Sequence, residues 1–348
     1  MQTLTLLHCG MSERLRGMLD TIPVLRAAEQ HPAAALPMLD LNNRTLLFCV
    51  AVDEWGQSEV LSTLLRSLRQ RSDCLEGARA AVVIDGTTEL DTKDIARRLI
   101  FAANLAGCAF PGKPLVEATG SLRNLAVLQK KHGLESLEAT YRFALEALIE
   151  RLCSFAPPKK AQPRLLMLHA SDRSTSNTLA LGERVAAQLA GIELETISLR
   201  NGTIHDCRGC SFKVCSHYAA QGSCFYGGAI NEQVLPALLR SDGLLLLCPN
   251  YNDAVGANIM AFINRMTSLT VSNALYGRSL YAVVVSGYSG GDIVAQQLLG
   301  ALCLNKAFSL PPRFCLIETA NDPGEALRLP GIEEKTTRFA AQIQRWFL

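Results

Sequence analysis

The stretch Arg164-Leu-Leu-Met-Leu-His-Ala-Ser-Asp-Arg-Ser-Thr-Ser-Asn-Thr178 decides the fold of this chain. Its first six residues form a short apolar run that predicts a buried strand. The residues that follow the polar loop, 177–190, have apolar side chains at helical spacing, which predicts a helix. A strand that passes through a polar loop into a helix is the opening unit of an α/β sheet.

The same alternation of strand and helix continues to residue 348. Residues 243–248 are entirely apolar, as expected for a strand that is buried on both faces. Five strands separated by helices predict an open, parallel, doubly wound sheet. Further strands are expected at residues 192–199, 280–286 and 314–318, and further helices at 231–240, 257–269, 292–302 and 333–347.

A break in composition divides the chain in two. Residues 154–163, Ser-Phe-Ala-Pro-Pro-Lys-Lys-Ala-Gln-Pro, contain three prolines and two lysines and follow a long helical pattern. We interpret this stretch as a linker. The sequence therefore predicts a first domain at residues 1–153 and a second domain at residues 164–348.

The first domain repeats the strand pattern of the second. Residues 46–50 resemble 245–249, residues 81–86 resemble 282–287, and residues 115–117 resemble 316–318, at offsets of 199, 201 and 201. Residues 6–8 resemble 167–169 at an offset of 161, so the first copy is shorter by about forty residues. Matches that keep both order and spacing predict a shortened, degenerate copy of the same fold.

Composition narrows the classes of function. The chain has 348 residues, 49% of them apolar, and a net charge of +2, which gives no electrostatic reason to expect nucleic acid or a membrane surface. No apolar run approaches ~18 residues, and the start lacks the pattern of a signal peptide. We expect a cytoplasmic protein.

The polar loop after the first strand of the second domain is a candidate anion site. It lies at the carboxyl edge of the sheet, where such folds bind ligands, and at a helix N-terminus, which favours an anion. Ser171, Ser176 and Thr178 offer hydroxyl donors, and Arg173 can cap a dianion. Because G-x-G-x-x-G and G-x-x-x-x-G-K-[ST] are both absent, the phosphate of flavin mononucleotide (FMN) fits better than a dinucleotide or a nucleoside triphosphate. The alternative is a helix-capping loop without a ligand.

Two further loops are expected at the same edge. Pro249-Asn-Tyr-Asn-Asp253 offers amides and the Tyr251 ring to a planar ligand, and Ser286-Gly-Tyr-Ser-Gly-Gly291 offers a flexible backbone that can approach a ring closely. For Tyr251 and Tyr288, ordinary surface packing is the alternative.

Four cysteines are clustered in an expected loop with the spacing C-x2-C-x4-C-x8-C, at positions 207, 210, 215 and 224. In a reducing compartment this clustering favours metal or redox chemistry over disulfides. Four thiolates can bind a [4Fe–4S] cluster or zinc, with His205 or His217 able to replace one thiolate at zinc, or the thiols can be vacant. Eight other cysteines are expected to act as small apolar residues: Cys9, Cys49, Cys74, Cys108, Cys153, Cys248, Cys303 and Cys315.

Residues 164–320 resemble the NADPH-dependent FMN reductase superfamily, and most of all its iron–sulfur flavoprotein branch. The resemblance rests on Ser-x-Arg with Ser-Asn-Thr in residues 170–178, the cysteine-rich stretch, the glycine-rich loop 287–291, and a Pro-x-Tyr…Ala-x-x-Met…Arg pattern. In that last pattern the matching residues are Pro249, Tyr251, Ala257, Met260, Ile263, preceded by Phe262, and Arg265. The branch typically shows C-x2-C-x2-C and a fourth cysteine, so the later two gaps here are longer.

The resemblance implies a flavodoxin-like sheet with strand order 2-1-3-4-5 that binds FMN non-covalently. It implies that the phosphate is held by Ser171, Arg173, Ser176, Asn177 and Thr178. It implies further that Pro249, Asn250, Tyr251 and Asn252 line the isoalloxazine, that Ser286, Gly287, Tyr288 and Gly290 close over it, and that Cys207, Cys210, Cys215 and Cys224 ligate the cluster.

These features predict an FMN-dependent oxidoreductase that relays electrons between FMN and a [4Fe–4S] cluster. Its expected partner is NAD(P)H or a redox protein. One alternative is an NAD(P)H-dependent FMN or quinone reductase with FMN only and a zinc or vacant cysteine site. Another is a non-enzymatic redox sensor.

The first domain is expected to bind no FMN. Its first loop, residues 9–13, lacks the Ser-x-Arg and Ser-Asn-Thr set, and residues 51–55 carry two carboxylates where the flavin edge would lie. Because the family is generally dimeric, we expect a homo-oligomer or a pseudo-dimer within one chain.

Overall fold

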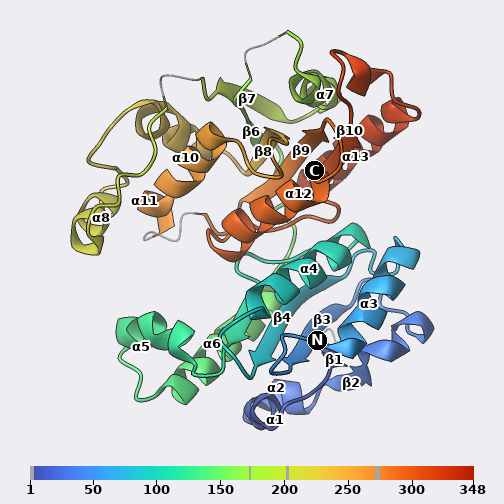
Figure 1. Ribbon diagram of the computed structural model, residues 1–348, viewed down its shortest axis with the longest axis vertical. Helices are drawn as coiled ribbons and strands as arrows, with labels where there is room; N and C mark the ends of the chain where they lie inside the picture. The colour runs from blue at the N-terminus through green and yellow to red at the C-terminus, as the bar shows by residue number, and fades with distance from the viewer. Residues whose placement is uncertain (1–3, 172–173, 201–203, 271–274) are drawn as a thin grey trace. The chain divides into compact units, whose positions relative to one another are not determined.

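The computed structural model describes residues 4–171, 174–200, 204–270 and 275–348. The chain splits into two compact units, Met1–Ala156 and Pro157–Leu348, each described here by itself (Figure 1). None of the helices in the described ranges combines the length and the apolar character needed to cross a membrane.

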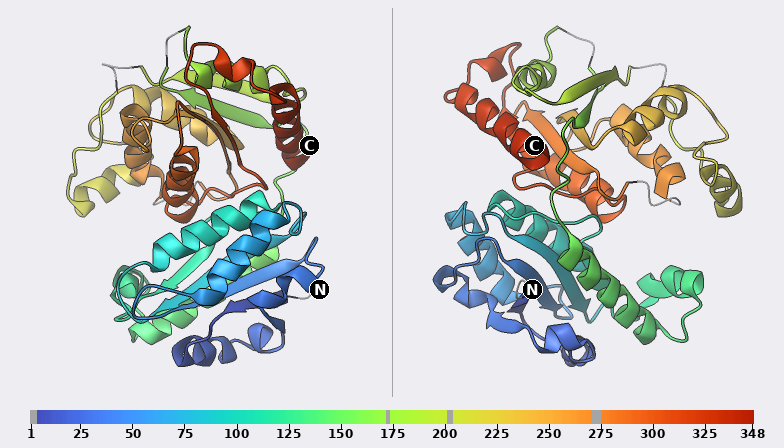
Figure 2. Two further views of the ribbon diagram at one scale, coloured as in Figure 1. Left: turned by 45° about the vertical axis from the view of Figure 1, so that its right-hand side comes forward. Right: turned by 180° about the vertical axis from the view of Figure 1, so that it is seen from behind.

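The first unit contains a parallel sheet of five strands in the order β2-β1-β3-β4-β5. Helices cover both faces of this sheet (Figure 2). Its strands are β1 (Leu4–Cys9), β2 (Glu29–Pro32), β3 (Thr45–Val52), β4 (Arg79–Gly86) and β5 (Leu115–Ala118). Its helices are α1 (Glu13–Asp20), α2 (Pro23–Arg26), α3 (Glu59–Gln70), α4 (Thr92–Leu105), α5 (Ala126–His132) and α6 (Leu137–Ser154).

The second unit contains a parallel sheet in the order β10-β9-β8-β6-β7. Numbered within the unit and read from its other edge, this is again 2-1-3-4-5, so the expected doubly wound, flavodoxin-like sheet is confirmed. Its strands are β6 (Arg164–His169), β7 (Glu193–Ser198), β8 (Gly243–Pro249), β9 (Ser279–Ser286) and β10 (Cys315–Thr319). Its helices are α7 (Asn177–Ala186), α8 (Phe212–Ala219), α9 (Leu235–Arg240), α10 (Ala257–Arg265), α11 (Thr267–Thr270), α12 (Gly291–Leu298) and α13 (Ile332–Phe347).

The two sheets correspond strand by strand, as the sequence repeat predicted. Each matched segment lies in the strand at the same position of its own sheet: β1 with β6, β3 with β8, β4 with β9, and β5 with β10. Isolated parallel bridges also recur, Arg79 with Ala109 in the first unit and Ser279 with Ser309 in the second. The first unit is therefore a second copy of the same fold.

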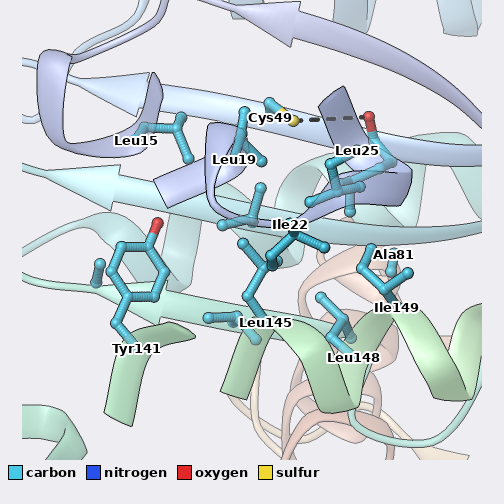
Figure 3. Packing of buried hydrophobic residues seen from close by; sticks show 14 of the residues in the cluster. Leu15, Leu19, Ile22, Leu25, Cys49, Ala81, Tyr141, Leu145, Leu148 and Ile149 are labelled. Atoms are coloured by element: carbon cyan, nitrogen blue, oxygen red, sulfur yellow. Dashed lines mark hydrogen bonds between the residues drawn. The ribbon is translucent and has the colours of Figure 1, made fainter. Parts of the chain in front are cut away.

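A buried apolar cluster fills the space between one face of the first sheet and helices α1, α2 and α6 (Figure 3). Leu15 and Leu19 enter from α1, and Leu145 and Leu148 enter from α6. Full burial of such a side chain contributes about 1.5–3 kcal/mol. This cluster therefore attaches both helices firmly to the sheet.

The structure differs from the sequence prediction in the cysteine-rich segment. We expected a loop, but α8 occupies its middle and contains Cys215. Ser211 caps this helix by accepting a hydrogen bond from the Val214 N–H at 3.5 Å. A short helix with a polar cap gives a weak apolar period, which explains why the sequence pattern missed it.

Candidate functional site

The N-terminus of α7 lies at the carboxyl edge of the second sheet. Ser176 is its N-cap, and the Ser176 Oγ accepts a hydrogen bond from the Leu179 N–H at 3.2 Å. Thr178 is buried in the first turn, Ser171 is half-buried in the loop, and Arg173 lies outside the described residues. The N–H groups of a first helical turn have no intrahelical acceptors, so this end of α7 can receive an anion.

Asn177 has a structural role that the sequence did not suggest. Its Nδ2 donates to the Asp322 carbonyl at 2.9 Å, and its Oδ1 accepts from the Ala326 N–H at 3.3 Å. The side chain therefore fastens the loop after β10 to α7. Both Nδ2 hydrogens are used within the protein, since Nδ2 also lies 3.4 Å from the Ala320 carbonyl, and the backbone N–H of Asn177 is the donor left for an anion.

Asn250 joins the loop after β8 to the loop after β9. Its Nδ2 lies within hydrogen-bond distance of Asp253 Oδ1 at 3.1 Å, Ser286 Oγ at 3.2 Å and the Ser289 carbonyl at 3.1 Å. Its backbone N–H donates to the Val285 carbonyl at 2.9 Å. The structure thus brings together two loops that the sequence only predicted to share an edge.

Gly290 makes this junction possible. Its φ is +93°, and a Cβ there would lie 1.9 Å from Asp253 Oδ1 and 3.0 Å from Asn250 Nδ2. Only glycine fits both the left-handed backbone and the missing space. Asn252 also has positive φ, at 53°, so the loop after β8 turns sharply toward the loop that contains Gly290.

Three buried polar atoms at this edge have no hydrogen-bond partner among the described residues. They are His169 Nδ1 at the end of β6, Ser198 Oγ at the end of β7, and Asn250 Oδ1 just after β8. His169 pairs with Ser198 in the sheet register. Leaving a buried polar atom unpaired costs roughly 1–3 kcal/mol, so such atoms are usually satisfied by a ligand or water. The sequence reasoning missed His169 and Ser198. For His169 a usable signal was its place at the end of the apolar run of β6, whereas Ser198 ends a strand that alternates polar and apolar residues.

The geometry fits a ligand with an anionic end and a planar end. The strand order reverses between β6 and β8, and open α/β sheets bind ligands at such a switch point. Tyr251 and Tyr288, on the two loops joined by Asn250, have 64% and 60% of their surface exposed. Their rings are therefore free to cover a planar group.

The four clustered cysteines line one small cavity of about 30 Å³. Burial raises the pKa of the Cys215 thiol, and the neighbouring Cys210, Cys207 and Cys224 raise it further. Thiols that repel each other's charge favour binding of a cation. Neither His205 nor His217 lines the cavity. As they stand, no three His, Cys, Asp or Glu side chains within the described ranges are arranged to hold a metal ion.

Helix α10 connects the two candidate sites within the second unit. It begins after the loop that contains Asn250, and its last residue, Arg265, lines the cysteine cavity and donates to the Gly227 carbonyl at 2.6 Å. Asn264 Nδ2 donates to Asp206 Oδ1 at 2.9 Å. Helix α10 has nine residues and is therefore about 13 Å long, so the loop that contains Asn250 and the cysteine cavity are separated by roughly this distance along the helix axis.

The corresponding edge of the first unit is occupied by its own side chains. Arg14, in the first turn of α1, binds Asp85 at the end of β4, with Nε to Oδ2 at 2.8 Å. The same guanidinium donates to the carbonyls of Gly86 at 2.9 Å, Thr119 at 3.0 Å and Gly120 at 3.1 Å. Ser12 caps α1 and donates to Asp85 Oδ1 at 2.9 Å.

Residues 163–322 match the family described as NADPH-dependent FMN reductase. The match spans most of the second unit and identifies it as a flavin-dependent oxidoreductase domain. It confirms the resemblance to the superfamily, whereas the iron–sulfur branch stays a prediction. No curated protein matches the chain in sequence.

Several solved structures are similar to part of the chain. RosB with a bound 8-demethyl-8-formylriboflavin-5'-phosphate intermediate is 14% identical, covers 53% of this chain and 78% of its own, and has a TM-score of 0.42. The Trp repressor binding protein from Bacillus subtilis is 17% identical. The match covers 50% of this chain and 98% of that protein, with a TM-score of 0.36. An FMN-dependent NADH-azoreductase from Bacillus anthracis, solved with FMN, is 10% identical to this chain. The match covers 52% of this chain and 99% of the azoreductase, with a TM-score of 0.36. Scores this low bear on neither the activity nor the substrate of this chain.

Proposed function

We propose that the second unit binds FMN at the carboxyl edge of its sheet and uses it to oxidise NAD(P)H and reduce an acceptor. The observation that carries the proposal is the row of unpartnered polar atoms on His169, Ser198 and Asn250, next to a helix N-terminus at the switch point. The family match of residues 163–322 supports the choice of FMN.

Each side chain has a definite task in this proposal. The first turn of α7, with Ser171, Ser176 and Thr178, binds the phosphate and offsets its charge. Asn250 Oδ1, which is buried and has no partner among the described residues, would accept a hydrogen bond from a ring N–H. Tyr251 and Tyr288 would cover the ring and exclude water. Pro249, Asn252, Ser286, Gly287 and Gly290 shape the two loops. When bound, FMN supplies the hydride and one-electron chemistry, so no acid–base side chain is required.

We also propose that Cys207, Cys210, Cys215 and Cys224 bind a [4Fe–4S] cluster, which would let the unit pass electrons singly. The cavity that all four cysteines line supports four-thiolate ligation. Zinc, or a vacant site beside a simple FMN-dependent reductase, is the alternative.

The proposal also covers the cellular compartment and the role of the first unit. The setting is a reducing compartment such as the cytoplasm, where clustered cysteines of this kind serve metal or redox chemistry. We propose that the first unit binds no FMN, since Arg14 and Asp85 already fill the polar positions at its sheet edge. The first unit would then serve as the partner of the second in a pseudo-dimer, or the chain would form a homo-oligomer.

A single preparation tests the proposal. Anaerobically purified protein is examined by absorbance, with flavin, iron, sulfide and zinc quantified on the same sample, and then assayed for NADH and NADPH oxidation. We expect about one FMN and four irons per chain. Flavin without iron would support the flavin-dependent reductase and would rule out the [4Fe–4S] cluster. Protein that neither contains nor takes up FMN would overturn the proposal.

A matched pair of variants tests the site itself. Asn250→Leu is expected to weaken FMN binding roughly tenfold, because it removes a buried acceptor and the junction of the two loops. Asn264→Leu makes the same chemical change on α10, outside the proposed flavin site, and should leave FMN binding unchanged. Equal losses in both variants would count against the assignment of Asn250.

A further inference from the structure

The first unit contains a pocket that plays no part in the proposed flavin chemistry. Its volume is about 290 Å³, and it is lined by residues of α1, of the loop before α1, and of strands β1 and β2. This volume is at the lower end of the range for small-molecule sites. Its lining consists of His8, Met11, Arg16, Leu19, Asp20 and Gln30.

Two opposite charges in the wall have no partner among the described residues. Arg16 and Asp20 are four residues apart on α1, a spacing that often gives an ion pair. Neither forms an ion pair or a side-chain hydrogen bond with another residue of the described part of the chain. Both charges therefore remain available to a ligand that carries a positive and a negative group.

His8 and Gln30 add neutral hydrogen-bonding groups. Burial lowers the pKa of His8, and the nearby charges of Arg16 and His31 lower it further. His31 is itself bonded to Glu29, with Nε2 2.7 Å from Oε1. A neutral imidazole offers one donor and one acceptor, so His8 can contact an anionic group without adding charge to the pocket.

The apolar part of the wall is formed by Met11 and Leu19. Leu19 is 5% exposed and belongs to the apolar cluster between the first sheet and helices α1, α2 and α6 (Figure 3), so the core fixes its position. Met11 is half-buried in the loop before α1 and adapts to different shapes. A ligand for this pocket therefore combines two charged groups with a short apolar side chain.

We propose that this pocket binds an apolar α-amino acid. The carboxylate lies against Arg16 and His8, the ammonium against Asp20, and the side chain against Met11 and Leu19. The ligand makes the two ion pairs that α1 leaves unmade, and this binding is separate from the flavin site of the second unit. The first unit thereby has a ligand of its own, although its sheet edge is occupied by Arg14.

Calorimetric titration of the full chain with L-leucine and two analogues tests the proposal without any mutation. The analogues are 2-hydroxy-4-methylpentanoate, which lacks the ammonium, and 4-methylpentanoate, which lacks both the ammonium and the hydroxyl. We expect saturable binding of L-leucine with a dissociation constant of about 1 mM or lower, roughly tenfold weaker binding of the hydroxy acid, and weaker binding still of the last. Equal affinity for all three compounds, or no saturable binding of L-leucine, would overturn the proposal.

Substitutions locate the ligand. Arg16→Gln and Asp20→Asn are each expected to weaken L-leucine binding five- to tenfold, roughly the value of one partly exposed charged hydrogen bond. Arg26→Gln removes an exposed arginine from the neighbouring helix α2, outside the pocket, and should bind L-leucine like the unmodified chain. FMN content should be the same in all variants. If Arg16→Gln binds as well as Arg26→Gln does, the pocket is not the binding site.

Discussion

The pairing of Arg14 with Asp85 makes a quantitative prediction about the first unit. The Asp85 side chain is only 3% exposed, and Arg14, at 30%, binds both of its oxygens, at 2.8 and 3.3 Å. Replacing Arg14 with methionine leaves the buried Asp85 carboxylate with the Ser12 hydroxyl as its remaining side-chain donor. The change also removes a donor from four backbone carbonyls, those of Gly86, Ala118, Thr119 and Gly120. Removing one partner of a buried pair costs about 3–5 kcal/mol, and the partial exposure of Arg14 favours the lower end, about 3 kcal/mol.

Native-state hydrogen exchange measures this loss within one unit. The amides of β4 should exchange roughly 100-fold faster in Arg14→Met, whereas the amides of β9, the equivalent strand of the second unit, act as the internal control. Arg142→Met removes an exposed pair with Glu146 on α6 and should cost less than about 0.5 kcal/mol.

A double-mutant cycle separates the pair from its surroundings. We compare the loss in the free energy of unfolding of the double variant, Arg14→Met with Asp85→Asn, with the sum of the losses of the two single variants. The double variant's loss should be smaller than that sum by at least about 1 kcal/mol, because Asp85→Asn removes the charge that Arg14→Met leaves unpaired. Additive losses, or a loss below about 1 kcal/mol in Arg14→Met alone, would refute the reasoning.

Three further predictions concern the second unit. Gly290→Ala should weaken FMN binding roughly tenfold in a fluorescence titration. Gly277→Ala is the control, because Gly277 also has positive φ but has open space around it, and it should not weaken binding. Equal effects of the two substitutions would exclude a role for the contact between the two loops. Thiols bind metals as thiolates, and the pKa of Cys215 is raised, so zinc affinity should rise with pH. Competition with a chelator measures this affinity. An affinity that does not depend on pH would contradict ligation by four thiols. Gly182→Ala should destabilise the second unit by about 1–3 kcal/mol in urea unfolding, since its Cβ would lie 2.4 Å from the Leu247 side chain; unchanged stability would show that α7 can move away from β8.

Most of the fold was predictable because its strands are short apolar runs bounded by polar loops. Residues 164–169 coincide with β6, and the other four predicted strands of the second unit match within one residue at each end. Helix ends were less predictable. The helix expected at 177–190 ends at Ala186, and the helix expected at 257–269 is divided into α10 and α11. Apolar period continues past the point where the backbone hydrogen bonds stop, so it does not mark the end.

The candidate site was predictable in place but not in detail. The order of strands and loops locates Ser176, Asn250 and Tyr251 at one sheet edge, because the carboxyl ends of parallel strands share an edge. Side-chain partners depend on residues far away in the sequence. The bond from Asn177 to the Asp322 carbonyl spans 145 positions, and no local pattern reveals that it uses up the Asn177 amide.

The division of the strands between the two halves of the chain has a consequence for folding during synthesis. Every described strand of the first sheet comes from residues 4–118, and every described strand of the second comes from residues 164–319. The first half can therefore complete its sheet while the second is still being translated, because it waits for no later strand. Translation at about 5–20 residues per second gives the first half many seconds alone before the second sheet can close.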